Sequence, residues 1–339
     1  MPAPARITVL MSVYNGARFL PGAIESILSQ SFADFELLII DDASKDDSIS
    51  VAEFYTDPRI RLVRNDKNLG LAPSLNKGLD LARGEYVARM DCDDVSITDR
   101  LSMQIDLMDT HPDIGICGTW IRLFGDHPGE IVRYYTDPDF NRSLLLFDPP
   151  VAHPSVMIRK SAFARYGLYY NESFRHAQDF ELWVRASEYV KISNVPRVLL
   201  QYRTHPAQAG NHSLDSQQKF AGKVRLWQLK RLQIEPTEEE FRTHQFLSRV
   251  IPVEITMDML ENSKHWLRKI QKANERQEVF PEPAFRRSLG MRWFYLCYMA
   301  SGLGMRVWRV FLSSPLSRLS LLNLKLYSNN ALNLLLARE

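Results

Sequence analysis

The first half of the chain alternates continuous apolar runs with segments of helical spacing. Residues 7–13 and 35–40 are largely apolar or β-branched on both faces, and residues 21–29 between them have the spacing of a helix. Strands without a polar face are typical of a parallel sheet that helices cover on both sides. The pattern continues with two more strands and one more helix, at residues 60–63, 86–90 and 74–82. It predicts an α/β fold.

Polar residues follow each of these strands directly. They stand at residues 12–15, 41–44, 64–65 and 91–94. In an open parallel sheet, ligands bind in the crevice beyond the carboxyl ends of the strands. Four polar endings on one edge therefore predict a single binding site.

Asp91, Asp93 and Asp94 are the densest group of acids on this edge. Three carboxylates this close repel one another unless a cation lies among them. Mg²⁺ and Mn²⁺ take oxygen ligands and complete their shell with substrate phosphates and water. The cluster predicts a site for a divalent metal and a nucleotide. The alternative is an acidic turn that caps the next helix, a role that suits Asp99.

Several motifs follow one another in a fixed order. They are Ser-Val-Tyr-Asn at 12–15, Asp-Asp-Ala-Ser at 41–44, Asn-Leu-Gly-Leu at 68–71, Asp-Cys-Asp-Asp at 91–94, His-Pro-Ser at 153–155, Gln-Asp-Phe-Glu-Leu-Trp at 178–183 and Tyr-Arg-Thr-His at 202–205. In this order they resemble the family 2 glycosyltransferases of the GT-A fold, over roughly the first two thirds of the chain. Three pieces of sequence are further similar to bacterial N-acetylglucosaminyl- and galactosyltransferases that build lipooligosaccharide, O-antigen or capsule; they are residues 73–76, 88–91 and 202–208.

The resemblance implies a Rossmann-like, mostly parallel sheet and an inverting transfer of a sugar from a nucleotide-diphosphate donor. That donor is a UDP-hexose or a UDP-N-acetylhexosamine, and the acceptor is a glycan or a lipid-linked saccharide. Tyr14 is implied to stack on the base, Asp42 to accept from the base or ribose, and Asp91 to contact the donor ribose. Further implied contacts to the nucleotide sugar are Asn15, Asn76, Arg89 and Arg203. The alternative for Asp42 is a residue that caps a turn.

The resemblance also assigns the metal and the catalytic base. It makes Asp93 the ligand of a Mn²⁺ or Mg²⁺ ion that bridges the donor phosphates, and places His205 where it binds either this ion or a phosphate. Asp179 is the predicted general base for the acceptor hydroxyl. Because it stands near a helix N-terminus, we expect its anion to be favoured, although an N-cap without catalytic duty fits the same position.

On the acceptor side the resemblance places His153, Trp183 and Gln178, the last at a position where most relatives carry an acid. Their alternatives are structural: a histidine before proline is often a turn residue, and a single tryptophan is often part of the core.

Composition narrows the protein class. The chain has 339 residues, 45% of them hydrophobic and 24% charged, with a net charge of +2. These values predict a packed globular protein and disfavour one whose whole surface binds nucleic acid. Cys92, Cys117 and Cys297 form no paired motif, and residues 7–13 are too short for a signal sequence. We therefore expect a cytoplasmic protein, peripheral to the inner face of the membrane if it is bound there; its oligomeric state is not predicted.

The sequence predicts a catalytic domain at 1–212, with the donor side in about 1–100 and the acceptor side in about 101–212. A helical region at 213–339 follows, with helices at 217–232, 238–249 and 257–273 and a long segment from 283 onward. Five arginines fall within a broad half of a helical projection of that segment. They are Arg286, Arg287, Arg292, Arg306 and Arg309. Two of them, Arg292 and Arg306, interrupt it before the roughly 20 apolar residues of a spanning helix are reached. The segment and the leucine-rich tail at 316–336 predict interfacial helices at a membrane. The alternative is helices packed against the catalytic domain or a second subunit.

Two other functions use the same features. A sugar-nucleotide nucleotidyltransferase also holds magnesium with aspartates on a parallel sheet, but it needs a glycine-rich phosphate loop after the first strand, and residues 14–18 are not one. A catalytically silent scaffold is disfavoured because Asp42, Asp91, Asp93 and Asp179 are all retained.

Overall fold

The computed structural model describes residues 5–126, 128–205, 214–248 and 254–317. The chain divides into two compact units. The first comprises Met1–Pro138 and Pro150–Ala221, and the second comprises Asp139–Pro149 and Gly222–Glu339.

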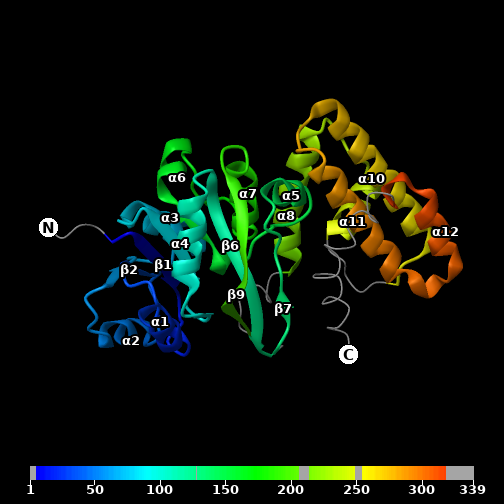
Figure 1. Cartoon of the computed structure of the whole chain (residues 1–339). Helices are drawn as coiled ribbons and strands as arrows, with labels where there is room; N and C mark the ends of the chain where they lie inside the picture. The colour runs from blue at the N-terminus through cyan, green and yellow to red at the C-terminus, as the bar shows by residue number, and fades with distance from the viewer. Residues whose placement is uncertain (1–4, 127, 206–213, 249–253, 318–339) are drawn as a thin grey trace. The chain divides into compact units, whose positions relative to one another are not determined.

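The first unit is built on one mixed sheet (Figure 1). Its strand order is β3-β2-β1-β4-β8-β6-β9-β5, and β7 pairs with β6. The four strands at one side of this order are parallel: β1 Ile7–Val13, β2 Phe35–Asp41, β3 Ile60–Arg64 and β4 Tyr86–Asp91. The others are β5 Val95–Ser96, β6 Ile114–Gly125, β7 Ile131–Val132, β8 Met157–Arg159 and β9 Lys191–Thr204. All four strands predicted in the first 90 residues are confirmed.

Helices flank this sheet because the strands carry apolar side chains on both faces. They are α1 Leu20–Leu28, α2 Ser48–Phe54, α3 Leu71–Leu81, α4 Arg100–Thr110, α6 Lys160–Tyr166 and α7 Gln178–Ala186. The helix α3 packs closely on β1 at Gly78, where an added Cβ would lie 2.1 Å from a methyl carbon of Leu10. It begins three residues before the predicted start.

The register brings the polar strand ends together. Ser12 on β1 lies beside Asp91 on β4, Val13 lies beside Asp41 on β2, and Asp41 lies beside Arg64 on β3. The carboxyl ends of four strands therefore share one edge, as the sequence predicted.

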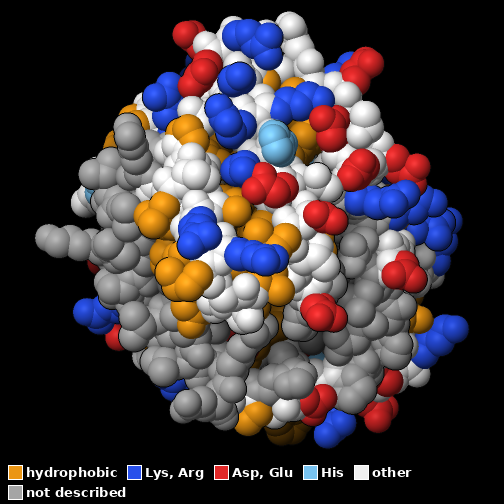
Figure 2. Space-filling model, turned by 90° about the vertical axis from the view of Figure 1, so that its right-hand side faces the viewer, with side chains coloured by type: hydrophobic (Ala, Val, Ile, Leu, Met, Phe, Trp, Pro, Cys, Tyr) orange, Lys and Arg blue, Asp and Glu red, His pale blue; other side chains and the backbone are white. Residues whose placement is uncertain are grey.

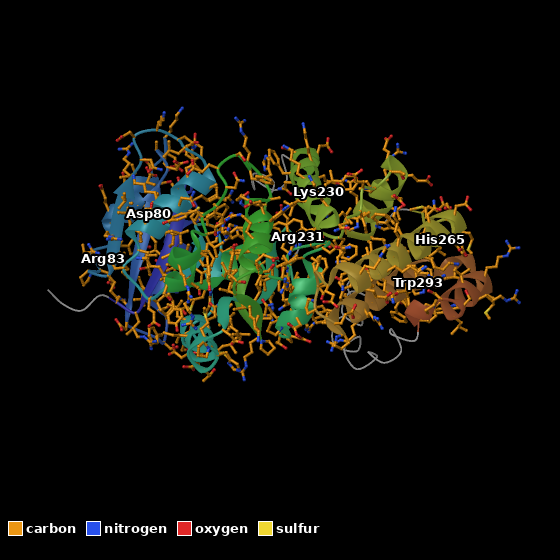
Figure 3. All side chains as sticks on the ribbon, turned by 90° about the horizontal axis from the view of Figure 1, so that it is seen from above. Asp80, Arg83, Lys230, Arg231, His265 and Trp293 are labelled. Atoms are coloured by element: carbon orange, nitrogen blue, oxygen red, sulfur yellow. The ribbon has the colours of Figure 1, made fainter. Side chains whose placement is uncertain are left out.

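The second unit is helical. It contains α5 Pro138–Leu144 from the middle of the chain, most of α8 Leu214–Arg231, α9 Glu238–Ser248, α10 Met257–Gln277, α11 Ala284–Met299 and α12 Met305–Ser313. The predicted helices are confirmed, although the long segment from 283 is two helices with Gly304 between them at a φ of 80°. Trp293 is completely buried among these helices (Figure 3). Most of the predicted tail helix, from residue 318, lies outside the described residues.

The two compact units divide the chain differently from the predicted boundary at 212, since the first unit extends to Ala221. Residues 139–149 belong to the helical unit and not to the catalytic domain. Leu146 and Phe147 are completely buried in the core of this unit. Asp148 accepts hydrogen bonds from Arg225 and Arg292, each at 3.1 Å. The segment is held there by the burial of its apolar side chains and by the two ion pairs of Asp148.

The helix α11 is a core helix. Its apolar residues Phe285, Leu289 and Trp293 are completely buried, and two of its arginines form ion pairs within the unit. The face formed by these residues is covered by protein, as the alternative of packed helices predicted, and a contact between α11 and a membrane stays a prediction. In the part of the chain that the structure describes, no helix combines the length and the apolar character needed to cross a membrane.

Candidate active site

The loops after β1 and β2 form the first wall of the site. Tyr14 is 46% exposed at the end of β1, so its ring is accessible to a planar ligand. Asn15 has a φ of 52°, and its side-chain oxygen accepts a hydrogen bond from the Lys45 backbone at 2.8 Å. Its own N–H donates to the Ser44 hydroxyl at 3.0 Å. Asn15 thus joins the two loops, while Tyr14 remains open to solvent.

Asp42 is buried and organises a third loop. Its carboxylate accepts hydrogen bonds from the Asn65 amide at 2.8 Å, the Leu69 N–H at 2.9 Å and the Gly70 N–H at 2.8 Å. These bonds fix residues 65–70 against the end of β2. A carboxylate has about four lone-pair sites, so the nucleotide contact predicted for Asp42 has one site left.

Asn76 links the donor side to the loop before α7. Its amide donates to the Tyr170 carbonyl at 2.9 Å and to Glu172 at 3.1 Å, and its oxygen accepts from the Tyr170 N–H at 2.8 Å. The side chain predicted to contact the nucleotide sugar is therefore engaged with protein on both its amide and its oxygen.

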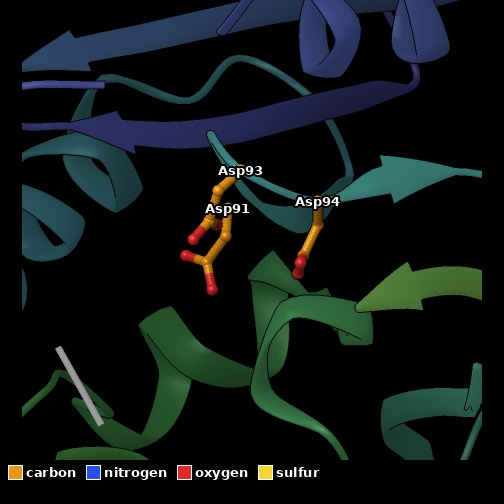
Figure 4. A group of neighbouring side chains, drawn as sticks. All are labelled: Asp91, Asp93 and Asp94. Carbon is orange, nitrogen blue, oxygen red and sulfur yellow. The ribbon is translucent and has the colours of Figure 1, made fainter. Parts of the chain in front are cut away.

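The three aspartates after β4 form a compact cluster (Figure 4). One oxygen from each of Asp91, Asp93 and Asp94 lies within 4.8 Å of the others. Arg89 donates to both oxygens of Asp91. One oxygen of Asp94 accepts from the Arg203 N–H at 2.8 Å, whereas the other is buried without a partner. Burial, together with the charges of Asp91 and Asp93, raises the pKa of Asp94 well above its usual range.

These residues fit a divalent cation. Hard oxygen ligands are present, one buried oxygen of Asp94 lacks a donor, and the mutual repulsion of the carboxylates is not neutralised by Arg89 alone. His205 approaches from the end of β9, with its Nε2 atom 3.1 Å from Asp93. The cation could therefore draw on Asp93 together with His205, the pair that the sequence predicted.

An aromatic sandwich that the sequence did not predict holds this end of β9. The Arg203 guanidinium lies 4.4 Å from the ring centre of Phe19 and 4.3 Å from that of Phe124. Its Nε donates to the backbone carbonyl of Asp93 at 2.7 Å. The Phe19 ring also lies 5.0 Å from that of His205. Phe19 thus contacts both Arg203 and His205, and its distance from residue 203 in sequence hid this role.

Asp179 is the second residue of α7 and is half-buried. Burial raises its pKa, and the Phe180 N–H and the charge of Arg89 act in the opposite direction without overcoming it. The expectation that the helix N-terminus favours the anion is therefore wrong in its net direction. The charge of Asp179 in turn raises the pKa values of Asp91 and Tyr134. Asp179 and the aspartate cluster thus belong to one electrostatic site.

Comparison with known proteins identifies the family. Residues 8–167 match the family described as "Glycosyl transferase family 2". The O-antigen biosynthesis glycosyltransferase WbnJ of Escherichia coli is 31% identical over 208 residues, which cover 59% of this chain and 80% of WbnJ. EpsE of Bacillus subtilis, also named as a glycosyltransferase, is 34% identical over 195 residues, which cover 56% of this chain and 69% of EpsE. The chain belongs to the family 2 glycosyltransferases.

Solved structures show that this glycosyltransferase has the GT-A fold. TarS 1–349 of S. aureus, in complex with UDP-GlcNAc, superposes with a TM-score of 0.59 at 15% identity, over 89% of this chain and 90% of TarS 1–349. The mannosyltransferase PcManGT of Pyrobaculum calidifontis, in complex with GDP-Man and Mn²⁺, superposes with a TM-score of 0.50 and covers 95% of this chain and 80% of PcManGT. At such identities the likeness concerns the fold alone.

The residues that the sequence predicted on the acceptor side form a packed group. The Nε2 atom of His153 is 2.8 Å from the Tyr170 hydroxyl, and burial together with Arg89 lowers the pKa of His153 well below its usual range. Trp183 is 0% exposed, and its ring packs against His153 and Tyr170. The predicted stacking face of Trp183 is therefore covered. Gln178 begins α7 beside Asp179 and is nearly buried.

Proposed function

We propose that this family 2 glycosyltransferase is a metal-dependent inverting enzyme. Its donor is a UDP-hexose or UDP-N-acetylhexosamine, and its acceptor is a glycan or lipid-linked saccharide in the synthesis of a cell-surface polysaccharide. One observation carries the proposal. The aspartate cluster, which fits a cation, lies in the same electrostatic site as Asp179, a separate half-buried carboxylate whose charge raises the pKa of Asp91. The UDP-GlcNAc bound to TarS supports this donor class, and the GDP-Man bound to PcManGT supports a nucleotide-diphosphate sugar more broadly.

The donor would lie along the carboxyl edge of the parallel strands. Tyr14 offers its exposed ring to the base, and the loop that Asp42 holds closes the ribose side. Asp93 and His205 would hold a Mn²⁺ or Mg²⁺ ion, which when bound neutralises charge on the diphosphate and so eases its departure. Arg203, fixed between two phenylalanine rings, adds a cation on the same side.

Asp179 performs the proton transfer. Its carboxylate accepts the proton of the acceptor hydroxyl as that oxygen forms a bond to the anomeric carbon. The attack comes from the face opposite the diphosphate, the bond between the anomeric carbon and the phosphate oxygen breaks, and the nucleoside diphosphate leaves. One displacement of this kind inverts the anomeric configuration. A pKa raised by burial makes Asp179 a stronger base than an exposed aspartate.

The test separates the two carboxylate roles. A panel of nucleotide sugars is screened with Mn²⁺ and Mg²⁺ for thermal stabilisation, because a ligand that binds only the folded state raises its melting temperature. With the donor so found, Asp179→Asn should lower kcat by roughly 10²- to 10⁴-fold and leave donor binding intact. Asp93→Ala should abolish the metal-dependent stabilisation. Asp106→Asn, on the exposed face of α4, is the matched control.

Transfer at the wild-type rate by Asp179→Asn would remove Asp179 from the mechanism. Product analysis by NMR tests the stereochemistry, since retention at the anomeric carbon would contradict a single displacement.

A further inference from the structure

Charge is unevenly distributed along this chain. Residues 283–338 contain eight basic residues and no acidic residue, whereas residues 1–282 contain 34 basic and 39 acidic residues. The net charge of +2 is therefore the sum of a net negative charge over residues 1–282 and a strongly positive C-terminal segment. A basic segment of this kind is attracted to anionic surfaces.

Within this segment the described helix α12 differs from α11 in having two apolar faces. Val307 and Phe311, four residues apart, are buried in the core of the helical unit. Met305 and Leu312 lie seven residues apart on another face and are 72% and 69% exposed. Leu303, just before the helix, is 40% exposed. One apolar face holds α12 to the protein, and the other is in water.

Two arginines accompany the exposed apolar residues. Arg309 lies between Met305 and Leu312 at helical spacing, and Arg306 lies next to Met305. Both are exposed, and neither has an ion-pair or hydrogen-bond partner among the described residues. The side of the molecule on which α12 lies shows basic side chains set among hydrophobic ones near the centre of the view, with acidic and basic side chains mixed above and to the right (Figure 2).

We propose that the outer face of α12, formed by Leu303, Met305, Arg306, Arg309 and Leu312, docks on a bilayer that contains anionic lipids. Methionine and leucine enter the boundary between headgroups and acyl chains, while each guanidinium stays at the level of the phosphates. Because α12 is anchored to the protein through Val307 and Phe311, its outer face is presented without a change of fold. This proposal is independent of the glycosyl-transfer mechanism.

Vesicle sedimentation of the full chain, without donor or metal, tests the proposal. Vesicles of phosphatidylcholine alone are compared with vesicles that also contain phosphatidylglycerol, and binding to the second should weaken as added salt shortens the screening length. Arg306→Gln/Arg309→Gln removes two charges and should weaken binding roughly 30-fold, from the usual worth of a basic residue at an anionic membrane. Met305→Ser/Leu312→Ser, which keeps the charge, should weaken it about tenfold or more.

The matched control is Lys272→Gln/Arg276→Gln on α10, which removes two exposed charges four residues apart in the same unit. It should leave vesicle binding near the wild-type level. Thermal melts of all three variants verify that the helical unit is folded. Equal binding to both kinds of vesicle, or loss of binding in the control as large as in the α12 variants, would overturn the proposal. So would ultracentrifugation that finds a dimer broken by Met305→Ser/Leu312→Ser together with no binding to vesicles.

Discussion

Replacing Phe19 by leucine tests whether the aromatic sandwich positions the metal side of the site. Leucine keeps an apolar side chain at this place but has no π face for Arg203 or His205. A single cation–π contact contributes about 0.5 to 2 kcal/mol, depending on desolvation. Arg203 keeps Phe124 on its other face, at 4.3 Å, so we expect a loss of about 1 kcal/mol in donor binding. This corresponds to a roughly fivefold higher KM for the donor.

The assay measures initial rates while the donor is varied at fixed metal and while the metal is varied at fixed donor. Only KM should change, because the predicted base Asp179 lies on α7. The described ring contacts of Phe19 are instead with Arg203 and His205. Phe124→Leu removes the other face of the sandwich and should have a similar effect. The double variant should lose more than the sum, because the guanidinium then keeps neither ring.

Phe54→Leu is the matched control, since Phe54 ends α2 and is 82% exposed. The reasoning fails if Phe19→Leu raises KM no more than this control does. It also fails if Phe19→Leu lowers kcat while KM stays constant, because that result would place Phe19 in the chemical step.

Two further predictions concern buried polar residues. Burial lowers the pKa of His244 to about 3, from about 6.5 in the unfolded chain, so the unfolded state takes up the proton first and stability falls as the pH drops below about 6.5. Between pH 7 and 5 the wild type should lose about 2 kcal/mol more in urea denaturation than His244→Gln does; equal losses would contradict the assignment. Asp42→Asn replaces one of the carboxylate oxygens that accept hydrogen bonds from the Leu69 and Gly70 N–H groups. It should lower the free energy of unfolding by about 2 to 3 kcal/mol. Unchanged stability with lost donor binding would instead make Asp42 a direct nucleotide contact.

The parallel half of the fold was predictable because its physical cause is local. A strand buried on both faces is apolar at most positions, and β1, β2 and β4 are. The place of β8 between β4 and β6 was not predictable in this way. It depends on pairing between residues about 70 apart, such as Tyr86 and Arg159, for which no local pattern exists.

The same distinction applies to the site. Carboxylates at strand ends can be recognised in the sequence, because the carboxyl ends of parallel strands share an edge. Their partners cannot, because the contacts are distant: Asn76 meets Tyr170, 94 residues later, and Asp94 meets Arg203, 109 residues later. The net pKa of Asp179 was misjudged for a related reason. A helix N-terminus is visible in sequence, whereas the degree of burial that opposes it is not.

Arg89 influences the acids on both the donor side and the acceptor side of the proposed reaction. It is nearly buried, it binds both oxygens of Asp91, and its charge lowers the pKa values of Asp91 and Asp179 against the effect of burial. Burial lowers the pKa of His153, and the charge of Arg89 lowers it further. One fixed cation therefore limits how far burial can protonate both the donor-side acid and the base. The three arginines near the cluster, Arg89, Arg100 and Arg203, carry one charge fewer than the four aspartates Asp91, Asp93, Asp94 and Asp179. A diphosphate would add to this excess of negative charge, which is the physical reason to expect a divalent ion with the donor.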